Sequence, residues 1–332
     1  MRLSDSIYVA GHTGLLGTAL VRRLQEMGYG NLLLAKHSEL DLTDSGAVRT
    51  FFERERPRYV FLAAAKVGGI LANSSLPAEF VFKNLSIQLN VINESYRTGV
   101  ERLLFVGSSC IYPKLAAQPL REDSLLSGPL EFTNRPYAVA KIAGIEMCWA
   151  YNRQYKTQFL AGMLTNLYGP GDNYHPTNSH LIPALMRRMH EAKVGQLEQA
   201  VIWGTGTPRR EFLYSEDAAD ACIFLLSLPH EQFAELVNSL ESPPLINVGW
   251  GKDMTVREIA RWIAEVVGFG GDLTFDPRKP DGTPRKVMDI GRLAALGWKP
   301  RTSLYDGLRK TYEDFCFRIA TDCPTSGVVR QG

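Results

Sequence analysis

Short apolar runs alternate with longer amphipathic stretches through the first half of the chain. The apolar runs, each bounded by turn residues, predict strands at 7–10, 31–35, 59–62, 102–106 and 158–164. The stretches between them predict helices, including those at 16–27, 45–56, 77–98 and 137–155. Strands that alternate with helices are typical of a doubly wound parallel sheet, so we expect an α/β fold of the Rossmann type.

This rhythm changes in the second half, where a polar, turn-rich stretch at 171–180 precedes a basic helix and shorter elements. We therefore expect a first domain of the Rossmann type over 1–170. A smaller α/β domain over 171–317 would mainly bind substrate, with a strand at 245–248 returning to the main sheet. Residues 318–332 lack a periodic pattern and are expected to form a flexible tail.

A glycine-rich turn joins the first predicted strand to the first predicted helix. It consists of Gly11, His12, Thr13, Gly14, Leu15, Leu16 and Gly17. Glycines let the backbone approach a pyrophosphate, and the N-terminus of the following helix stabilises its negative charge. Because strand, turn and helix follow in this order, the turn predicts a dinucleotide site.

The residues after the second strand bear on which dinucleotide binds. An acid there would bind the ribose diol of NAD, whereas a basic group would accept the 2′-phosphate of NADP. The chain has Lys36 and His37 and no acid before Glu39, which favours NADP(H). The third strand ends in small residues that would leave room beside the cofactor, namely Ala63, Ala64 and Ala65.

Tyr137 and Lys141, four residues apart, would lie on one face of a helix. An ammonium near a phenol should lower the phenol pKa, which would make Tyr137 a proton donor or acceptor near neutral pH. The spacing alone occurs by chance in many helices and more often marks a pair without function. The glycine turn upstream, and a strand that runs into Ser108 and Ser109, favour the catalytic interpretation.

Cys110 follows these serines directly, and His180 heads a predicted helix after the polar loop. A thiol and an imidazole near a ketone can move protons on the neighbouring carbons, such as C3 and C5 of a 4-keto sugar. From the residues alone, a role as a small buried apolar residue is favoured for Cys110. For His180, a helix cap or a cofactor contact is as well supported as catalysis.

Composition argues against some classes of function but identifies no catalytic residue. The chain has 332 residues, is 45% hydrophobic and carries a net charge of +2, so charge implies no polyanionic partner such as nucleic acid. Five scattered cysteines without Cys-x-x-Cys spacing argue against a metal site. No apolar run reaches the ~18 residues of a membrane span, and no targeting segment is visible. A cytoplasmic protein is expected.

Longer strings carry a more specific resemblance. They lie at 107–114, which runs Gly-Ser-Ser-Cys-Ile-Tyr-Pro-Lys, and at 63–70, 166–170, 175–180 and 279–286. With the glycine turn, they resemble the GDP-L-fucose synthase family of the extended short-chain dehydrogenase/reductase superfamily over about residues 7–312. The resemblance implies an NADP(H)-dependent 3,5-epimerase-4-reductase that converts GDP-4-dehydro-6-deoxy-D-mannose to GDP-L-fucose. It also implies a homodimer formed through the helices after the third strand and after Tyr137.

By this resemblance, a reductase triad comprises Ser108, Tyr137 and Lys141, and the epimerisations fall to Cys110 and His180, with Cys110 as base by analogy only. Cofactor contacts would be the glycine turn, the three alanines, Lys36, His37, Asp41, Leu42, Lys141, Asn166, Leu167 and His180. Substrate contacts would be Ser109, Arg188, Trp203, Arg210 and Asp281. Two arginines suit a diphosphate, which each can bind in bidentate fashion.

Some family members carry an arginine in the glycine turn where this chain has Thr13, so the NADP(H) preference depends on Lys36 and His37. A sibling enzyme on another nucleotide 4-keto-deoxy-sugar, such as a GDP-colitose synthase, remains an alternative. Sugar 4,6-dehydratases carry an Asp-Glu pair where this chain has Cys110 and Ile111, which argues against that branch. A catalytically silent NADPH-binding sensor would usually lack Tyr137 or Lys141.

Overall fold

A six-stranded parallel sheet forms the centre of the computed structural model, which describes residues 1–176, 179–279 and 281–322. Its spatial order is β10-β5-β4-β3-β1-β2. The strands are β1 (Ile7–Ala10), β2 (Leu32–Leu33), β3 (Tyr59–Leu62), β4 (Arg102–Ser108), β5 (Phe159–Leu164) and β10 (Leu245–Val248). Every neighbouring pair is parallel, which confirms the expected doubly wound sheet. The return of residues 245–248 to this sheet, beside β5, is also as expected.

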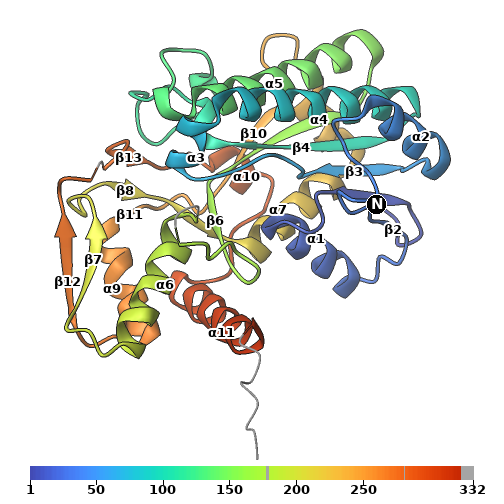
Figure 1. Cartoon of the computed structure of the whole chain (residues 1–332). Coiled ribbons are helices and arrows are strands. Elements are labelled where there is room, and N and C mark those ends of the chain that lie inside the picture. The colour runs from blue at the N-terminus through green and yellow to red at the C-terminus, as the bar shows by residue number, and fades with distance from the viewer. Residues whose placement is uncertain (177–178, 280, 323–332) are drawn as a thin grey trace, which may run out of the picture.

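Helices cover both faces of the sheet (Figure 1). One face carries α2 (Ser45–Glu55), α4 (Pro77–Arg97) and α5 (Arg135–Tyr155); the other carries α1 (Leu15–Glu26), α7 (Ser215–Ser227) and α8 (His230–Val237). Successive residues of β1 alternate between the two cores, because Ile7 and Val9 pack with α1 and Tyr8 packs with α2. Burial on both faces explains why these strands are continuous apolar runs.

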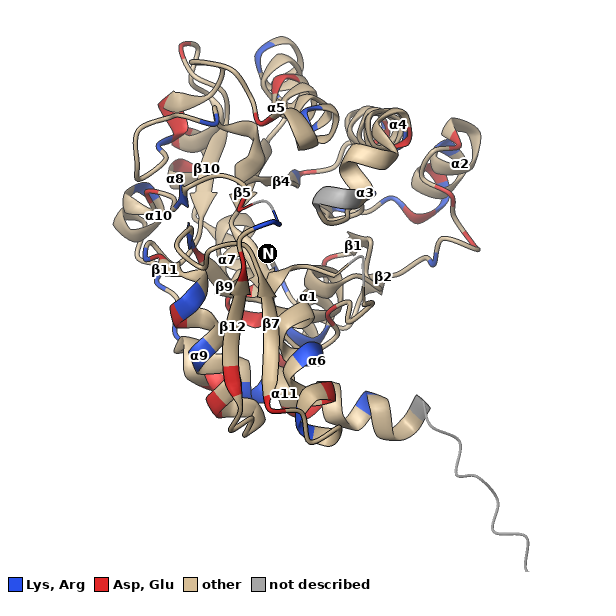
Figure 2. Cartoon of the chain, turned by 60° about the vertical axis from the view of Figure 1, so that its left-hand side comes forward, with Lys and Arg blue, Asp and Glu red and all other residues tan. Residues whose placement is uncertain are grey.

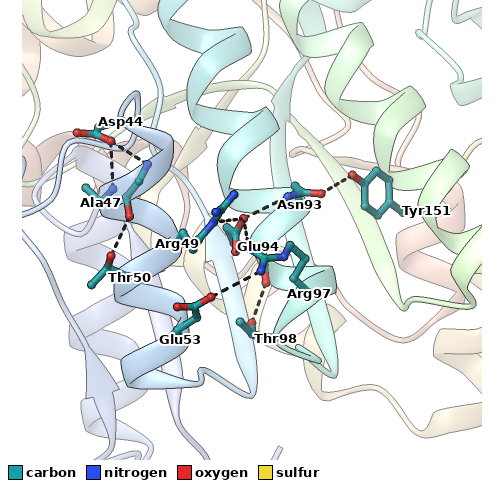
Figure 3. A network of polar contacts seen from close by, with 11 residues as sticks. Asp44, Ala47, Arg49, Thr50, Glu53, Asn93, Glu94, Arg97, Thr98 and Tyr151 are labelled. Carbon is teal, nitrogen blue, oxygen red and sulfur yellow. Dashed lines mark hydrogen bonds and ion pairs between the residues drawn. The ribbon is translucent and has the colours of Figure 1, made fainter.

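A polar network ties α2, α4 and α5 together on one face (Figure 3). The buried carboxylate of Glu94 accepts two bonds from Arg97 Nη1, at 2.8 and 3.0 Å, and lies 4.0 Å from Arg49. Asn93 accepts a bond of 3.0 Å from the Tyr151 hydroxyl. These contacts fix α5, the helix that carries Tyr137 and Lys141, relative to the rest of the layer.

The second half of the chain builds a smaller α/β unit beside the sheet (Figure 1). Its helices are α6 (Leu181–Val194), α9 (Val256–Val267) and α11 (Leu304–Asp322), which share a third core. Two parallel strands, β7 (Gln199–Trp203) and β12 (Asp272–Asp276), lie at its outer side. A small sheet consists of β11 (Met254–Thr255), β8 (Arg209–Arg210) and β13 (Arg285–Lys286), and β6 (Asn166–Tyr168) pairs with β9 (Phe212–Tyr214).

Some elements differ from the sequence-based expectation. The short helices α3 (Ile70–Ser75) and α10 (Gly291–Ala295) carry no clear period and were not expected. The expected tail at 318–332 begins too early, because α11 continues to Asp322. Its last turns are supported by an ion pair of 2.8 Å between Arg318 and Asp314, four residues apart. The remainder of that tail, 323–332, lies outside the described residues.

Basic and acidic residues are interspersed along the helices of the sheet layers and of the smaller unit (Figure 2). Among the described residues, none of the helices combines the length and apolar character needed to cross a membrane. The same residues contain no group of three or more His, Cys, Asp or Glu side chains placed to hold a metal ion.

Candidate active site

The glycine turn packs tightly against the end of β3. Gly11 has a φ of +85°, and a Cβ at that position would lie 2.7 Å from Cα of Ala64. A Cβ at Gly17 would lie only 2.0 Å from the carbonyl oxygen of Gly11, so the first turn of α1 can approach only because both residues lack side chains. The His12 ring buries an Nδ1 atom that has no partner within the described chain. The turn and its unpartnered polar atom fit a pyrophosphate at the N-terminus of α1.

The loop after β2 presents basic side chains to solvent. Lys36 and His37 are both exposed, while the carboxylate of Glu39 turns back to accept the backbone N–H of Lys36 at 2.8 Å. His37 Nδ1 lies 3.9 Å from Asp41, whose pKa is lowered by hydrogen bonds from Thr43. An exposed lysine beside a histidine in this position fits a ribose phosphate.

Four further predicted cofactor residues follow β2 and β3. Ala63 to Ala65 follow β3 and are half-buried, with Ala64 against the glycine turn. Leu42 is buried, and its carbonyl accepts a bond of 2.9 Å from Asn90 of α4, which fixes the loop. A separate groove of about 580 Å³ between β2 and α2 contains none of the predicted catalytic residues.

Ser108 and Cys110 stand where β4 runs into a short 3₁₀ turn, Ser109–Ile111. The Ser108 hydroxyl oxygen accepts the backbone N–H of Cys110 at 3.4 Å and so caps the turn. Only 7% of Cys110 is exposed, and this burial raises the thiol pKa. Three other groups lower the thiol pKa and therefore lie near it, namely Lys286, Ser108 and Lys141.

Tyr137 and Lys141 lie in the first turns of α5. Lys141 Nζ donates a bond of 2.8 Å to the Val106 carbonyl and lies 5.8 Å from the centre of the Tyr137 ring. Burial lowers the pKa of Lys141 to about 8. The pKa of Tyr137 is raised, by burial first and by Cys110 second, so the expected lowering by Lys141 is wrong in this structure. Desolvation of a phenolate outweighs the nearby ammonium, which favours the neutral phenol of Tyr137.

His180 occupies the position immediately before α6, but its side chain makes no capping hydrogen bond. The helix-cap interpretation therefore has no support in the structure. The carbonyl oxygen of the preceding residue, Ser179, would lie 3.5 Å from a Cβ at Gly69, so this segment abuts the loop after β3. Part of the ring is exposed, yet surrounding protein atoms lower the pKa of His180 by desolvation, which favours the neutral imidazole.

Trp203 presents a flat surface at the end of β7, with 56% of the residue exposed. The Arg188 guanidinium lies 5.5 Å and the Lys279 ammonium 5.2 Å from its ring centre. Arg188 is held by a bond of 2.6 Å from Nη1 to the Val201 carbonyl. A groove of about 370 Å³ runs beside Arg188 and Trp203, between α6 and β7. An aromatic face beside cations fits a nucleotide base with attached phosphates.

Arg210 and Asp281 meet through the backbone of Asp281, whose carbonyl accepts a bond of 3.2 Å from Arg210 Nη2. The Asp281 carboxylate accepts the N–H and the hydroxyl of Thr205, both at 2.8 Å. Asp281 therefore fixes the turn after Trp203 as well as the Arg210 guanidinium. Asn166 joins this region to the main sheet, because its Nδ2 donates a bond of 2.9 Å to the carbonyl of Glu211. The neighbouring Leu167 pairs with Leu213 in β9.

Two residues that sequence reasoning did not single out lie close to this machinery. The buried carboxylate of Glu211 accepts three backbone N–H bonds, from Trp250 and Gly251 at 2.6 Å and from Met288 at 2.9 Å. Lys286 interacts electrostatically with Cys110. The only sequence signal for Lys286 was its place at the end of the string 279–286, which assigned it no role.

The architecture and these side chains define a nucleotide-dependent enzyme of the short-chain dehydrogenase/reductase type. Residues 7–238 match the model of the NAD dependent epimerase/dehydratase family, and the chain belongs to that family.

The similar proteins narrow this class. GDP-L-fucose synthase 1 of Arabidopsis thaliana is 56% identical over 310 residues, which cover 93% of each chain. GDP-L-fucose synthase of Escherichia coli (strain K12) is 52% identical over 309 residues, covering 93% of this chain and 96% of the relative. These values confirm the resemblance to GDP-L-fucose synthases.

Among solved structures, a GDP-mannoheptose C4 reductase from Campylobacter jejuni with NADP bound superposes with a TM-score of 0.86. It is 39% identical, and the match covers 95% of this chain and 99% of that one. Family and neighbour together support a nicotinamide cofactor, which the glycine turn, Ala64 and the pocket of Tyr137 fit.

Proposed function

We propose that the protein converts GDP-4-dehydro-6-deoxy-D-mannose to GDP-L-fucose and consumes NADPH. One observation carries the proposal: where β4 ends beside the first turns of α5, the thiol of Cys110 lies close enough to Tyr137 and Lys141 to interact with both. Reduction of a ketone does not need that thiol, whereas epimerisation needs a group that can move protons. The 52% and 56% identity to GDP-L-fucose synthases supports the same conclusion.

Epimerisation would precede reduction. In the proposed order, Cys110 takes a proton from C3 or C5, the C–H electron pair moves into the adjacent ketone, and an enolate forms. His180 returns a proton to the opposite face of the same carbon, which inverts it. Both groups then exchange protons with water before the second centre reacts. Because burial raises the pKa of Cys110, its action as a base requires nearby positive charge.

Reduction at C4 completes the reaction. When bound, NADPH supplies the hydride for this step. Tyr137, kept neutral by burial, donates the proton to the developing alkoxide, and Ser108 hydrogen-bonds to the same oxygen. Lys141 would move from the Val106 carbonyl to the nicotinamide ribose, where its charge stabilises the tyrosinate that remains.

Recognition of the GDP moiety falls to the smaller unit. Arg188 and Arg210 would bind the diphosphate, and Trp203 would lie against the nucleoside. Ser109 adjoins the catalytic serine and would contact the sugar. Asp281 holds Arg210 and the turn after Trp203, so it shapes the site even though its carboxylate is occupied by Thr205.

We infer NADP(H) over NAD(H) from Lys36 and His37, and a homodimer from the outer surface of α4 and α5. Apolar side chains repeat at seven-residue intervals along α4, with 67% of Phe82 and 48% of Leu89 exposed. Tyr96 continues this line and stacks on Tyr155 of α5 at 4.1 Å between ring centres. A second copy would bury this surface. A reducing, cytoplasmic location fits the cysteines within the described part of the chain, which are all free: Cys110, Cys148, Cys222 and Cys316.

The test compares the wild type with Cys110→Ser, with Cys316→Ser as a control thiol outside the pocket. NADPH oxidation is measured with GDP-4-dehydro-6-deoxy-D-mannose, and NMR identifies the product and follows deuterium uptake at C3 and C5. We expect GDP-L-fucose from the wild type and the control, and a reduced but uninverted sugar from Cys110→Ser. Release of an uninverted sugar by the wild type would show a simple reductase. No oxidation would favour a sibling keto-sugar or a silent sensor.

A further inference from the structure

His180 lies between two segments of chain that both contact α11, the helix that ends the described residues. The leading segment is 171–174, and the following segment is α6, which begins directly after His180. The His180 carbonyl accepts the N–H of Ala184 in the first turn of α6, at 3.0 Å. The backbone of His180 is therefore placed by the contacts that hold these segments.

The leading segment is attached to α11 by hydrogen bonds. The backbone N–H of Gly171 donates to the Asp314 carboxylate at 2.8 Å. The hydroxyl of Tyr174 donates to the carbonyl of Thr311 at 3.1 Å, one turn earlier on the same helix. Both acceptors belong to α11, so the course of the leading segment follows the position of that helix.

The following segment, α6, lies beside α11 (Figure 1) and contacts it through His190. His190 Nδ1 lies 2.9 Å from the Tyr312 hydroxyl, and its ring packs edge-on against Phe315 with 5.2 Å between ring centres. The two segments are also joined to each other, because Arg187 of α6 donates a bond of 3.0 Å to the Tyr174 carbonyl. These contacts enclose the chain that carries His180.

Phe315 is the side chain that both segments share. Its ring centre lies 4.7 Å from that of Tyr174 and 5.2 Å from that of His190. Only 2% of Phe315 is exposed, and it is packed in the third core. Because a packed interior transmits a change of volume to its neighbours, a smaller side chain at this position should shift both segments and His180 with them.

On the basis of the proposed function, we propose that Phe315 is a positioning residue that holds His180 where it can return a proton to C3 and C5. Inversion needs proton donors on both faces of the sugar. When His180 is displaced, the S–H bond of Cys110 breaks instead, its proton returns to the original face of the carbon, and the thiolate is restored. The enolate electron pair re-forms the C–H bond there, and the configuration is retained.

The same geometry confines the effect to epimerisation. Tyr137 and Lys141 belong to α5, which is attached to α4 through the bond of 3.0 Å between Tyr151 and Asn93. Neither of these helices belongs to the core that contains Phe315. A change at Phe315 should therefore leave the ketone reduction intact, so the sugar is reduced without inversion.

The experiment compares Phe315→Leu and Tyr312→Phe with the wild type. Phe315→Leu removes the shared ring, and Tyr312→Phe removes only the hydroxyl that contacts His190. The control, Phe269→Leu, makes the same change in the same core, between α9 and β12. Each complete protein receives NADPH and GDP-4-dehydro-6-deoxy-D-mannose, and NMR measures the ratio of inverted to uninverted product. Both products come from the same folded molecules, so the ratio does not depend on the folded fraction.

We expect Phe315→Leu to lower this ratio roughly tenfold, because a displacement of about 1 Å can cost roughly 10²-fold in rate. Tyr312→Phe should lower it less, Phe269→Leu should keep the wild-type ratio, and KM for the sugar should change little. Amide hydrogen exchange, followed by mass spectrometry, provides a measurement without substrate. The peptide that contains Ala184 should exchange faster in Phe315→Leu than in the wild type or in Phe269→Leu.

An unchanged product ratio in Phe315→Leu would overturn the proposal, as would an equal fall in Phe269→Leu, which would indicate a general loss of packing. The failure of the proposed function looks different, because the wild type itself then releases only uninverted sugar. In that case faster exchange of the Ala184 peptide in Phe315→Leu alone still supports the positioning of His180, and equal exchange in both variants overturns it. If Phe315→Leu does not fold, as judged by circular dichroism, Tyr312→Phe takes its place in each comparison.

Discussion

The residues proposed for reduction and those proposed for epimerisation are assembled in different ways. The first group, Ser108, Tyr137 and Lys141, belongs to β4 and α5, which pack against each other within the sheet layer. In the second group, Cys110 shares that layer, but His180 precedes α6 in the smaller unit. One half is thus a local feature of a strand and its helix, whereas the other exists only where the two parts meet.

This difference has a functional meaning. A perturbation of the smaller unit should reach His180 before it reaches Tyr137, because α5 is attached to α4 through the bond between Tyr151 and Asn93 (Figure 3). The two activities should therefore be separable by mutation. Each of the following predictions tests that separation.

The largest effect is expected from Tyr137→Phe. Loss of the proton donor should lower NADPH oxidation roughly 10²–10⁴-fold, the usual contribution of a general acid. Deuterium uptake at C3 and C5 should stay within about twofold of the wild type, since proton movement there does not require the phenol. In one sample, NMR of the sugar measures deuterium uptake and the absorbance of NADPH measures its oxidation. An equal loss of both would contradict independent halves.

Asp172 should make the loop before His180 sensitive to pH. Burial raises its pKa to about 7, and its Oδ2 has no partner among the described residues. Since the folded pKa lies above the unfolded one, the stabilisation is complete below about pH 4 and is lost as the pH rises through 7. At pH 8, the free energy of unfolding of Asp172→Asn should therefore exceed that of the wild type by at most about 4 kcal/mol, and its unfolding temperature should be higher. At low pH the two proteins should have the same stability.

Thermal unfolding from pH 5 to pH 8 measures this difference, with Glu235→Gln as a control at an exposed carboxylate on α8. A constant offset between Asp172→Asn and the wild type would show that Asp172 does not titrate in this range.

Glu94→Ala should affect stability without affecting chemistry. It removes a buried carboxylate from the network between α2 and α4 and leaves Arg97 with only its longer ion pair of 3.6 Å to Glu53, among the described residues. We expect a loss of about 2 kcal/mol, reduced from the value for a fully buried pair because Arg97 is partly exposed. Urea denaturation measures it. With the folded fraction held constant, the ratio of exchange to reduction should equal that of the wild type, and a changed ratio would couple the network to the site.

The smallest effect concerns the cofactor. Lys36→Ala should raise KM for NADPH about fivefold and leave that for NADH unchanged, because an exposed cation contributes about 1 kcal/mol to a phosphate contact. Initial rates with both cofactors provide the comparison, and Lys83→Ala on α4 is a matched control. Equal changes for the two cofactors would remove Lys36 from 2′-phosphate recognition.

The sequence predicted those features that depend on neighbouring residues. β1, β3 and α9 fall on the expected residues because their periodicity and boundaries are local. The glycine turn was predictable for the same reason. The direction of the Tyr137 pKa shift was not, because it depends on burial by distant segments rather than on Lys141 alone. Lys286 carries no local signal for its proximity to Cys110, since 175 intervening residues and a separate sheet create it.

The position of β10 has a consequence for the synthesis of the chain. All residues of β5 are buried, but until residue 248 has been added this strand forms the open edge of the sheet. An apolar edge strand pairs readily with other chains, so the growing polypeptide passes through a stage at which aggregation competes with folding. A fragment that ends at residue 170 would remain at that stage and is expected to collect in the insoluble fraction. Chaperones that shield apolar strands should therefore improve the yield of the complete protein.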